Sequence, residues 1–152
     1  NLNDGLQSTL MLVKNSFPTD FVLNKEFGNI PDIECTPGKI NQVFMNIITN
    51  GLQSIIERQS TVPGTGVLTI RTSSEDGHVK VSIRDNGTGI KDSVREKIFE
   101  PFYTTKPVGQ GTGLGMSIVK GIIDSHNGTI EVISNFGDGA EFIITLPVKY
   151  LA

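Results

Sequence analysis

The chain has 152 residues, of which 37% are hydrophobic and 19% charged, enough apolar content for one globular domain with a buried core. Its formal net charge of −3 does not favour a nucleic-acid or anionic-membrane surface, and its single Cys35 excludes an internal disulfide and a thiolate metal site. No apolar run is long enough to cross a bilayer, and no signal peptide opens the chain. Because the first residue is Asn1 rather than Met, we expect a piece of a longer protein.

The first part of the chain shows helical spacing followed by alternation. Apolar residues three or four positions apart predict a helix over residues 1–16, which ends before Pro18. Alternating apolar and polar residues predict a strand over residues 20–27 and a short one over residues 32–35.

A long helix over residues 37–57 is the clearest expected element. Thr36 as a cap followed by Pro37 is typical of a helix start. Asn46 and Asn50 lie one turn apart on a separate face, a pairing that is common on solvated helices. The apolar face comprises Ile40, Val43, Phe44, Ile47, Ile48, Leu52, Ile55 and Ile56.

The next strand is followed by a carboxylate. Residues 67–72 and 78–84 are predicted to form a hairpin joined by residues 73–77. The apolar residues of the second strand share one face, and Asp85 is the next position on that face. A carboxylate directed into an apolar layer without a partner is costly or takes up a proton. Asp-Asn-Gly is also ordinary turn chemistry, so this stretch alone leaves a turn and a site equally open.

The last third of the chain is expected to contain two helices and a closing hairpin. The first helix spans residues 91–99 and the second residues 113–125, with a mobile loop over residues 103–112 between them. The closing strands span residues 129–135 and 140–147. The second helix is expected to pack Leu114, Ile118 and Ile122 and to end at Asn127-Gly128.

The order of these elements predicts the fold class. Strands and helices occur in runs rather than in strict alternation, which indicates a single α+β domain. We expect a two-layer sandwich in which a mainly antiparallel, mixed sheet is covered on one face by helices.

A glycine-rich loop, GQGTGLG at residues 109–115, leads directly into the last helix. Unpaired N–H groups at a helix N-terminus suit phosphate. The spacing matches neither a P-loop nor a dinucleotide fingerprint. A flexible surface loop is the alternative for this run alone.

Several motifs in this order resemble the catalytic ATP-binding domain of sensor histidine kinases, within the Bergerat-fold ATPase superfamily. The resemblance covers nearly the whole chain. Residues 41–51 resemble the N box, DNGTGI at 85–90 the G1 box, IFEPFYTTK at 98–106 the F box, GTGLG at 111–115 the G2 box, and residues 137–139 with Phe142 a third glycine motif.

The resemblance implies a role for each matched residue. Asp85 would accept a hydrogen bond from the adenine amino group, and Gly87 and Gly89 would let the backbone pass close to the base. Asn50 would supply an oxygen to Mg²⁺, with Asn46 near the same metal and the γ-phosphate.

The resemblance also implies a phosphate cradle and a lid. Lys106 would be the charged contact of the lid, and Phe99 and Phe102 would anchor that lid in the core. Asn46 and Lys106 are the catalytic candidates. The implied nucleotide-binding residues are Asn46, Asn50, Asp85, Gly87, Gly89, Ile90, Thr104, Thr105, Lys106, Gly111, Thr112, Gly113, Leu114 and Gly115.

The chain departs from related domains at informative positions. Many members carry a basic or aromatic residue three or four positions after the magnesium asparagine, where this chain has Gln53 and Ser54. Hydrolytic relatives use a glutamate base where this chain has Asn46, so ATP should be held without rapid hydrolysis. Neither His78 nor His126 follows the acceptor pattern, so the acceptor histidine is expected on a separate domain.

The expected function is to bind Mg-ATP and donate its γ-phosphate to a histidine in two-component signal transduction. The expected partners are the protein's own dimerisation and acceptor-histidine domain and a response regulator receiver domain, with no nucleic acid and no direct membrane contact. We expect a monomeric fragment of a homodimeric, cytoplasmic parent, whose membrane anchoring stays open. The alternatives are another Bergerat-fold ATPase, an anti-sigma type serine kinase, or an interaction module without nucleotide binding.

Overall fold

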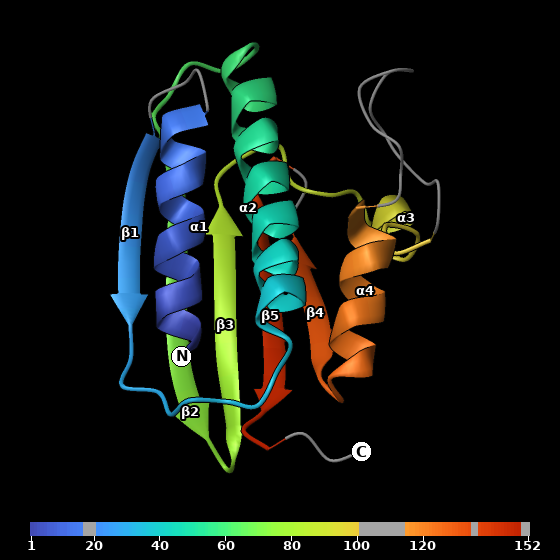
Figure 1. Cartoon of the computed structure of the whole chain (residues 1–152). Helices are drawn as coiled ribbons and strands as arrows, with labels where there is room; N and C mark the ends of the chain where they lie inside the picture. Colours follow the sequence, from blue (N-terminus) through green and yellow to red (C-terminus); the bar gives the residue numbers. More distant parts are fainter. Residues whose placement is uncertain (17–20, 101–114, 135–136, 150–152) are drawn as a thin grey trace.

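The computed structural model describes residues 1–16, 21–100, 115–134 and 137–149. Within these ranges the chain forms two layers, a five-stranded sheet with helices on one of its faces (Figure 1). In chain order the elements are α1 (Leu2–Ser16), β1 (Phe21–Phe27), α2 (Pro37–Gln59), β2 (Gly66–Glu75), β3 (His78–Asp85), α3 (Asp92–Arg95), α4 (Gly115–Ser125), β4 (Thr129–Ser134) and β5 (Ala140–Pro147).

The sheet is mixed and mainly antiparallel, as the sequence predicted. Its strand order is β1-β2-β3-β5-β4. The edge strand β1 runs parallel to β2, and all other neighbours are antiparallel. β3 lies in the centre, and its last residue, Asp85, is paired with Leu68 of β2 and Ala140 of β5.

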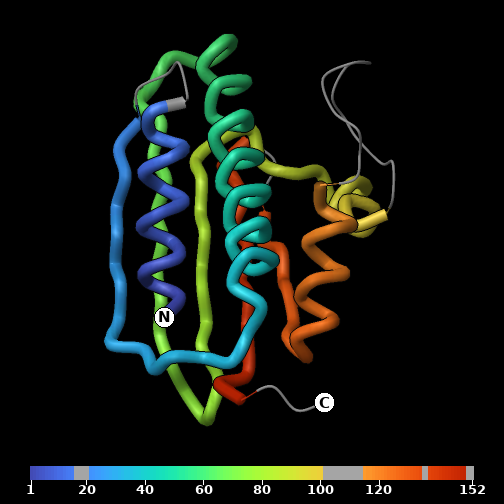
Figure 2. Tube along the Cα trace, in the orientation of Figure 1, coloured from blue at the N-terminus to red at the C-terminus, as the bar shows by residue number. Residues whose placement is uncertain are grey.

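The hydrophobic core lies between the sheet and the helices. α2 crosses the middle of the sheet, with α1 on one side of it and α4 on the other (Figure 2). Seven of the eight apolar residues predicted for its inner face are buried, and Ile56 is partly buried. On β3 the alternation holds to the end of the strand, because Val79, Val81 and Ile83 are buried and Asp85 is only 5% exposed.

The β2–β3 hairpin is longer than expected. Residues 73–75 were predicted to belong to the connection, but they continue β2. The turn is made by Asp76 and Gly77 alone, with φ of 52° and 75°. An Asp-Gly pair accommodates two left-handed residues, so the strands stay paired up to this two-residue turn.

The prediction of a strand over residues 32–35 is wrong. The segment alternates as expected, since Ile33 and Cys35 are half-buried and Glu34 is exposed. A backbone bond from the Glu34 N–H to the Val148 carbonyl, at 3.0 Å, joins it to the residue after β5, but the segment forms no strand. Alternation reports one buried face, whereas a strand also needs a neighbour along its length.

The helix predicted over residues 91–99 is much shorter. α3 ends at Arg95, and the chain continues through tighter turns. The N–H groups of Lys97 and Glu100 bond to carbonyls three residues earlier, at 2.8 and 3.0 Å. These turns place Ile98 and Phe99 against the core, as expected for Phe99 as an anchor.

α4 packs through a face slightly different from the predicted one. Ile122 is buried as expected, but Ile118 is 39% exposed, and Leu114 lies outside the described residues. The predicted helix end is confirmed. Asn127 has a left-handed φ of 57°, and the Gly128 N–H bonds to the Ile123 carbonyl at 3.0 Å. The buried face consists of Met116, Val119, Ile122 and Ile123.

The connection between β4 and β5 offers a test of how tightly it packs on the end of β3. Gly137 and Gly139 have φ of +98° and +95°, so alanine at either is strained, by roughly 1–2 kcal/mol. A Cβ at Gly139 would also overlap the Asp85 carbonyl oxygen, whereas a Cβ at Gly137 would meet nothing within 4 Å. Gly139→Ala is therefore expected to lower the free energy of unfolding by about 3 kcal/mol or more.

Gly137→Ala is the matched control, with an expected loss of only about 1 kcal/mol. Urea unfolding of the two variants measures the difference. Equal losses of unfolding free energy in the two variants would show that the fold relieves the overlap with Asp85 at no energetic cost.

Candidate nucleotide-binding site

The carboxylate of Asp85 lies at the end of β3, directly beneath α2. Its Oδ1 accepts the Gly87 N–H at 2.8 Å. A Cβ on Gly51 of α2 would lie 3.3 Å from its Oδ2, so the backbone of the helix passes very close to the carboxylate. The placement predicted from strand alternation is confirmed.

Burial raises the pKa of Asp85 from 3.8 to about 6. The backbone N–H groups of Gly87 and Ala140 act in the opposite direction, because they stabilise the charged form. Among the described residues, Asp85 has no ion pair. The described part of the fold therefore holds a carboxylate in an apolar layer without a cation paired to it.

The turn after Asp85 contains three more of the predicted site residues. Gly87 contacts α2 so closely that a Cβ there would overlap the Ser54 hydroxyl, which explains the glycine without reference to a ligand. Gly89 has a left-handed φ of 75°. The Ile90 N–H donates to the Ser134 hydroxyl at 2.7 Å, and the Ile90 side chain packs partly buried against the core.

The two asparagines of α2 lie on the side of the helix that faces α4. The Asn46 amide donates to the Gly115 carbonyl at 3.3 Å, which joins the N box to the last residue of the G2 motif. Asn50 is partly buried one turn further along α2. Within the described ranges, no cluster of three or more His, Cys, Asp or Glu side chains could hold a metal ion. A cation here would depend on amide oxygens and on oxygens of its own ligand.

The remaining predicted site residues lie outside the described residues. These are Thr104, Thr105 and Lys106 of the expected lid, the loop residues Gly111, Thr112, Gly113 and Leu114, and the expected lid anchor Phe102.

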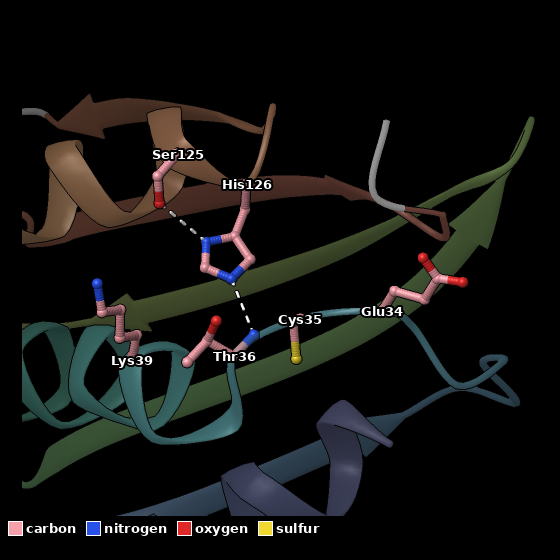
Figure 3. Close-up of a pocket in the computed structure, with 6 residues that line it drawn as sticks. All are labelled: Glu34, Cys35, Thr36, Lys39, Ser125 and His126. Carbon is pink, nitrogen blue, oxygen red and sulfur yellow. Dashed lines mark hydrogen bonds between the residues drawn. The ribbon is translucent and has the colours of Figure 1, made fainter. Parts of the chain in front are cut away.

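His126 is buried rather than solvated, and it links two helices. Its Nε2 accepts the Thr36 N–H at 3.1 Å, which ties the end of α4 to the start of α2 (Figure 3). Its Nδ1 lies 2.8 Å from the Ile122 carbonyl. His78 is exposed, with Nδ1 2.9 Å from the Asp76 carbonyl. Both ring nitrogens of His126 are therefore engaged within the fold.

A cavity of about 370 Å³ opens beside His126, away from Asp85. Thr36 borders this cavity, whereas Gly51 lies against Asp85. The two residues are 15 positions apart, which is roughly 22 Å along the helix. The cavity is therefore separate from the site around Asp85. Its lining residues are Glu34, Cys35, Thr36, Lys39, Ser125 and His126.

Two residues that contact the site were not predicted from the sequence. Ser134 accepts the Ile90 N–H and donates to the Gly139 carbonyl at 3.0 Å, so it joins the G1 turn to the closing hairpin. Arg58 donates to the carbonyls of the turn at residues 86 and 87. Arg58 follows Ser54 by one helical turn, a spacing visible in the sequence, whereas nothing local distinguishes Ser134.

Comparison with known proteins identifies the family. The profile described as "Histidine kinase-, DNA gyrase B-, and HSP90-like ATPase" matches residues 35–150. The chain therefore belongs to this ATPase family, and within it the chain is similar to the catalytic ATP-binding domains of sensor histidine kinases. The resemblance inferred from the motifs is confirmed.

Two curated relatives and one solved structure illustrate the similarity. The sensor histidine kinase ZraS of Escherichia coli is 37% identical over 151 residues, covering 98% of this chain and 30% of that protein. Sporulation kinase C of Bacillus subtilis is 34% identical, covering 97% and 33%. The catalytic domain of the histidine kinase ThkA, in a nucleotide-free form, is 31% identical with a TM-score of 0.82, covering 98% and 93%.

The chain thus spans about a third of the length of these two curated relatives but nearly all of the isolated ThkA catalytic domain. In the ranges that the structure describes, no helix has the length and apolarity needed to cross a membrane.

The buried carboxylate makes stability depend on pH. Asp85→Asn is expected to raise the free energy of unfolding of the ligand-free domain by about 2–3 kcal/mol near pH 8. The reason is that a pKa raised from 3.8 to about 6 means that the folded state disfavours the charged carboxylate. The stability contributed by the neutral acid is fully present below about pH 4 and is lost as the pH rises through about 6.

The gain from Asp85→Asn should therefore shrink as the pH approaches 4. Urea unfolding of both proteins between about pH 4.5 and 8 measures it. Asp138→Asn, at an exposed position, is the matched control. A gain that did not change with pH would contradict the burial argument.

Proposed function

We propose that this domain binds Mg-ATP and donates its γ-phosphate to a histidine on a separate dimerisation domain. The observation that carries the proposal is the buried, unbalanced carboxylate of Asp85. Such a group lowers stability, and it becomes useful when a ligand donates a hydrogen bond to it. The family supports ATP as that ligand.

Asp85 would recognise the base of the nucleotide through a hydrogen bond. The carboxylate accepts the backbone N–H groups of Gly87 and Ala140, and its remaining lone pairs would accept the adenine amino group. Recognition by a charged hydrogen bond to a buried carboxylate favours adenine over a purine without that amino group.

The residues on α2 fit a magnesium ion bound together with nucleotide phosphates. Asn50 would supply a neutral amide oxygen, and waters and phosphate oxygens would complete the coordination. Bound Mg²⁺ would neutralise charge on the phosphates during transfer. Asn46 lies one turn away and hydrogen-bonds the start of α4, so it would hold the phosphate-binding end of that helix near the metal.

The chemistry of this chain suits phosphoryl transfer better than hydrolysis. The amide of Asn46 cannot activate water as a base, so bound ATP should persist until an acceptor arrives. His126 has both ring nitrogens engaged inside the fold. We therefore expect the acceptor histidine on another domain, with a response regulator receiving the phosphate from it. The names of the curated relatives support these partners.

The nucleotide contact is tested by isothermal titration of ATP and ADP into the domain. Asp85→Asn is expected to weaken both by about 1.5–3 kcal/mol, because the adenine contact is shared and charge-assisted. If ATP with Mg²⁺ produced neither heat nor a thermal shift with the wild-type domain, nucleotide binding would be refuted.

Phosphoryl transfer is tested by mixing the domain with the dimerisation domain of its parent protein and labelled ATP. Acid-labile label on a histidine is the expected outcome, and Asp85→Asn should reduce its rate. Acid-stable label on a serine would instead identify a serine kinase.

The role of Asn50 is tested through the dependence of binding on magnesium. Asn50→Ala should weaken ATP by roughly 1–2 kcal/mol when Mg²⁺ is present and leave binding in EDTA nearly unchanged, since only the metal is contacted. Gln42→Ala, which removes an exposed amide from the same helix, is the control. An equal loss with and without Mg²⁺ would show that Asn50 does not bind the metal.

A further inference from the structure

One face of α2 lies directly on the turn formed by residues 86–88. Gly51, Ser54 and Arg58 follow one another at steps of three and four residues, which places them on one side of the helix. Gly51 lies over the Asp85 carboxylate, and the other two reach the turn that follows it. The same helix face therefore contacts both the carboxylate and its supporting turn.

Ser54 bonds to the backbone and to the side chain of Thr88. Its Oγ accepts the Thr88 N–H at 2.9 Å and lies 3.1 Å from Thr88 Oγ1. The close approach leaves no space for a Cβ at Gly87. The hydroxyl of Ser54 is thus engaged with the turn.

Arg58 extends the contact to the two preceding peptide units. Its Nη1 donates to the carbonyls of Asn86 at 3.1 Å and Gly87 at 3.3 Å. Bonds from a guanidinium are charge-assisted and stronger than neutral ones. Together with Ser54, it ties three consecutive residues of the turn to α2.

The opposite side of the turn is held by the chain that enters β2. Asn86 Oδ1 accepts the Val67 N–H at 2.7 Å, and its Nδ2 donates to the Thr65 carbonyl at 2.9 Å. With the turn held on both sides, the Gly87 N–H stays on Oδ1 of Asp85. The orientation of the Asp85 carboxylate therefore depends on the position of this turn.

We propose that Ser54 and Arg58 are positioning residues for base recognition. By holding residues 86–88, they orient the Asp85 carboxylate and so determine how strongly the pocket prefers a purine that carries a 6-amino group. The proposal rests on the proposed function, in which Asp85 binds adenine.

The test compares ATP with purine riboside triphosphate, which lacks the 6-amino group. Ser54→Ala and Arg58→Met are each expected to weaken ATP by about 3- to 10-fold, the effect of losing one supporting hydrogen bond. Purine riboside triphosphate should change by less than about 2-fold, because it does not use the carboxylate. Arg58→Lys keeps a charged donor and should recover part of the loss.

Ser60→Ala is the matched control, since it removes a hydroxyl from an exposed residue at the end of the same helix. It should leave both affinities unchanged. In an Asp85→Asn background, Ser54→Ala should have no further effect on ATP, because the group that it positions is already altered.

Equal losses for the two nucleotides, or losses that add to that of Asp85→Asn, would overturn the positioning role. Thermal unfolding shows whether each variant is folded. If Ser54→Ala does not fold, the affinities of Arg58→Met for the two nucleotides are compared instead. A wild-type domain that bound both nucleotides equally would refute the adenine contact of Asp85 itself, which separates the two failures.

Discussion

The burial of one carboxylate is the constraint on which the site depends. Asp85 continues the inward face of β3, where every other inward residue is apolar. Its pKa of about 6 reflects the cost of that position, and a neutral residue of similar size would make a more stable fold. Within the residues that the structure describes, no cation is paired with Asp85 to offset that cost. The surrounding structure supplies the backbone N–H groups of Gly87 and Ala140, which stabilise the charged form but leave the pKa raised.

α2 contributes both to the stability of the domain and to the geometry of the site. Its apolar face forms the centre of the core, while its remaining surface carries Asn46 and Asn50 toward α4 and Ser54 and Arg58 toward the turn after β3. A long helix fixed by so many buried side chains is a rigid support. The placement of these polar groups around Asp85 therefore follows from the packing of one element.

The features of the fold that were predicted correctly are those that follow from local periodicity in the sequence. The long helix, the inward direction of Asp85 and the closing hairpin all follow from repeats of 3.6 or 2 residues. The strand expected over residues 32–35 failed because pairing depends on a distant neighbour. For the same reason the bond from His126 to Thr36 left no local signal, since the two residues lie 90 positions apart. The helical spacing of Arg58 from Ser54 is visible in the sequence, but the turn that Arg58 contacts lies 28 positions away.

The attachment of α4 to α2 fixes the position of the two helices relative to each other. Asn46 bonds to Gly115 at the start of α4, and Thr36 bonds to His126 at its end. These bonds span 10 residues of α2 and 11 of α4, about 15 and 16 Å, so two antiparallel helices are held at matching points. The positive end of the α4 dipole is thereby kept within one turn of Asn50.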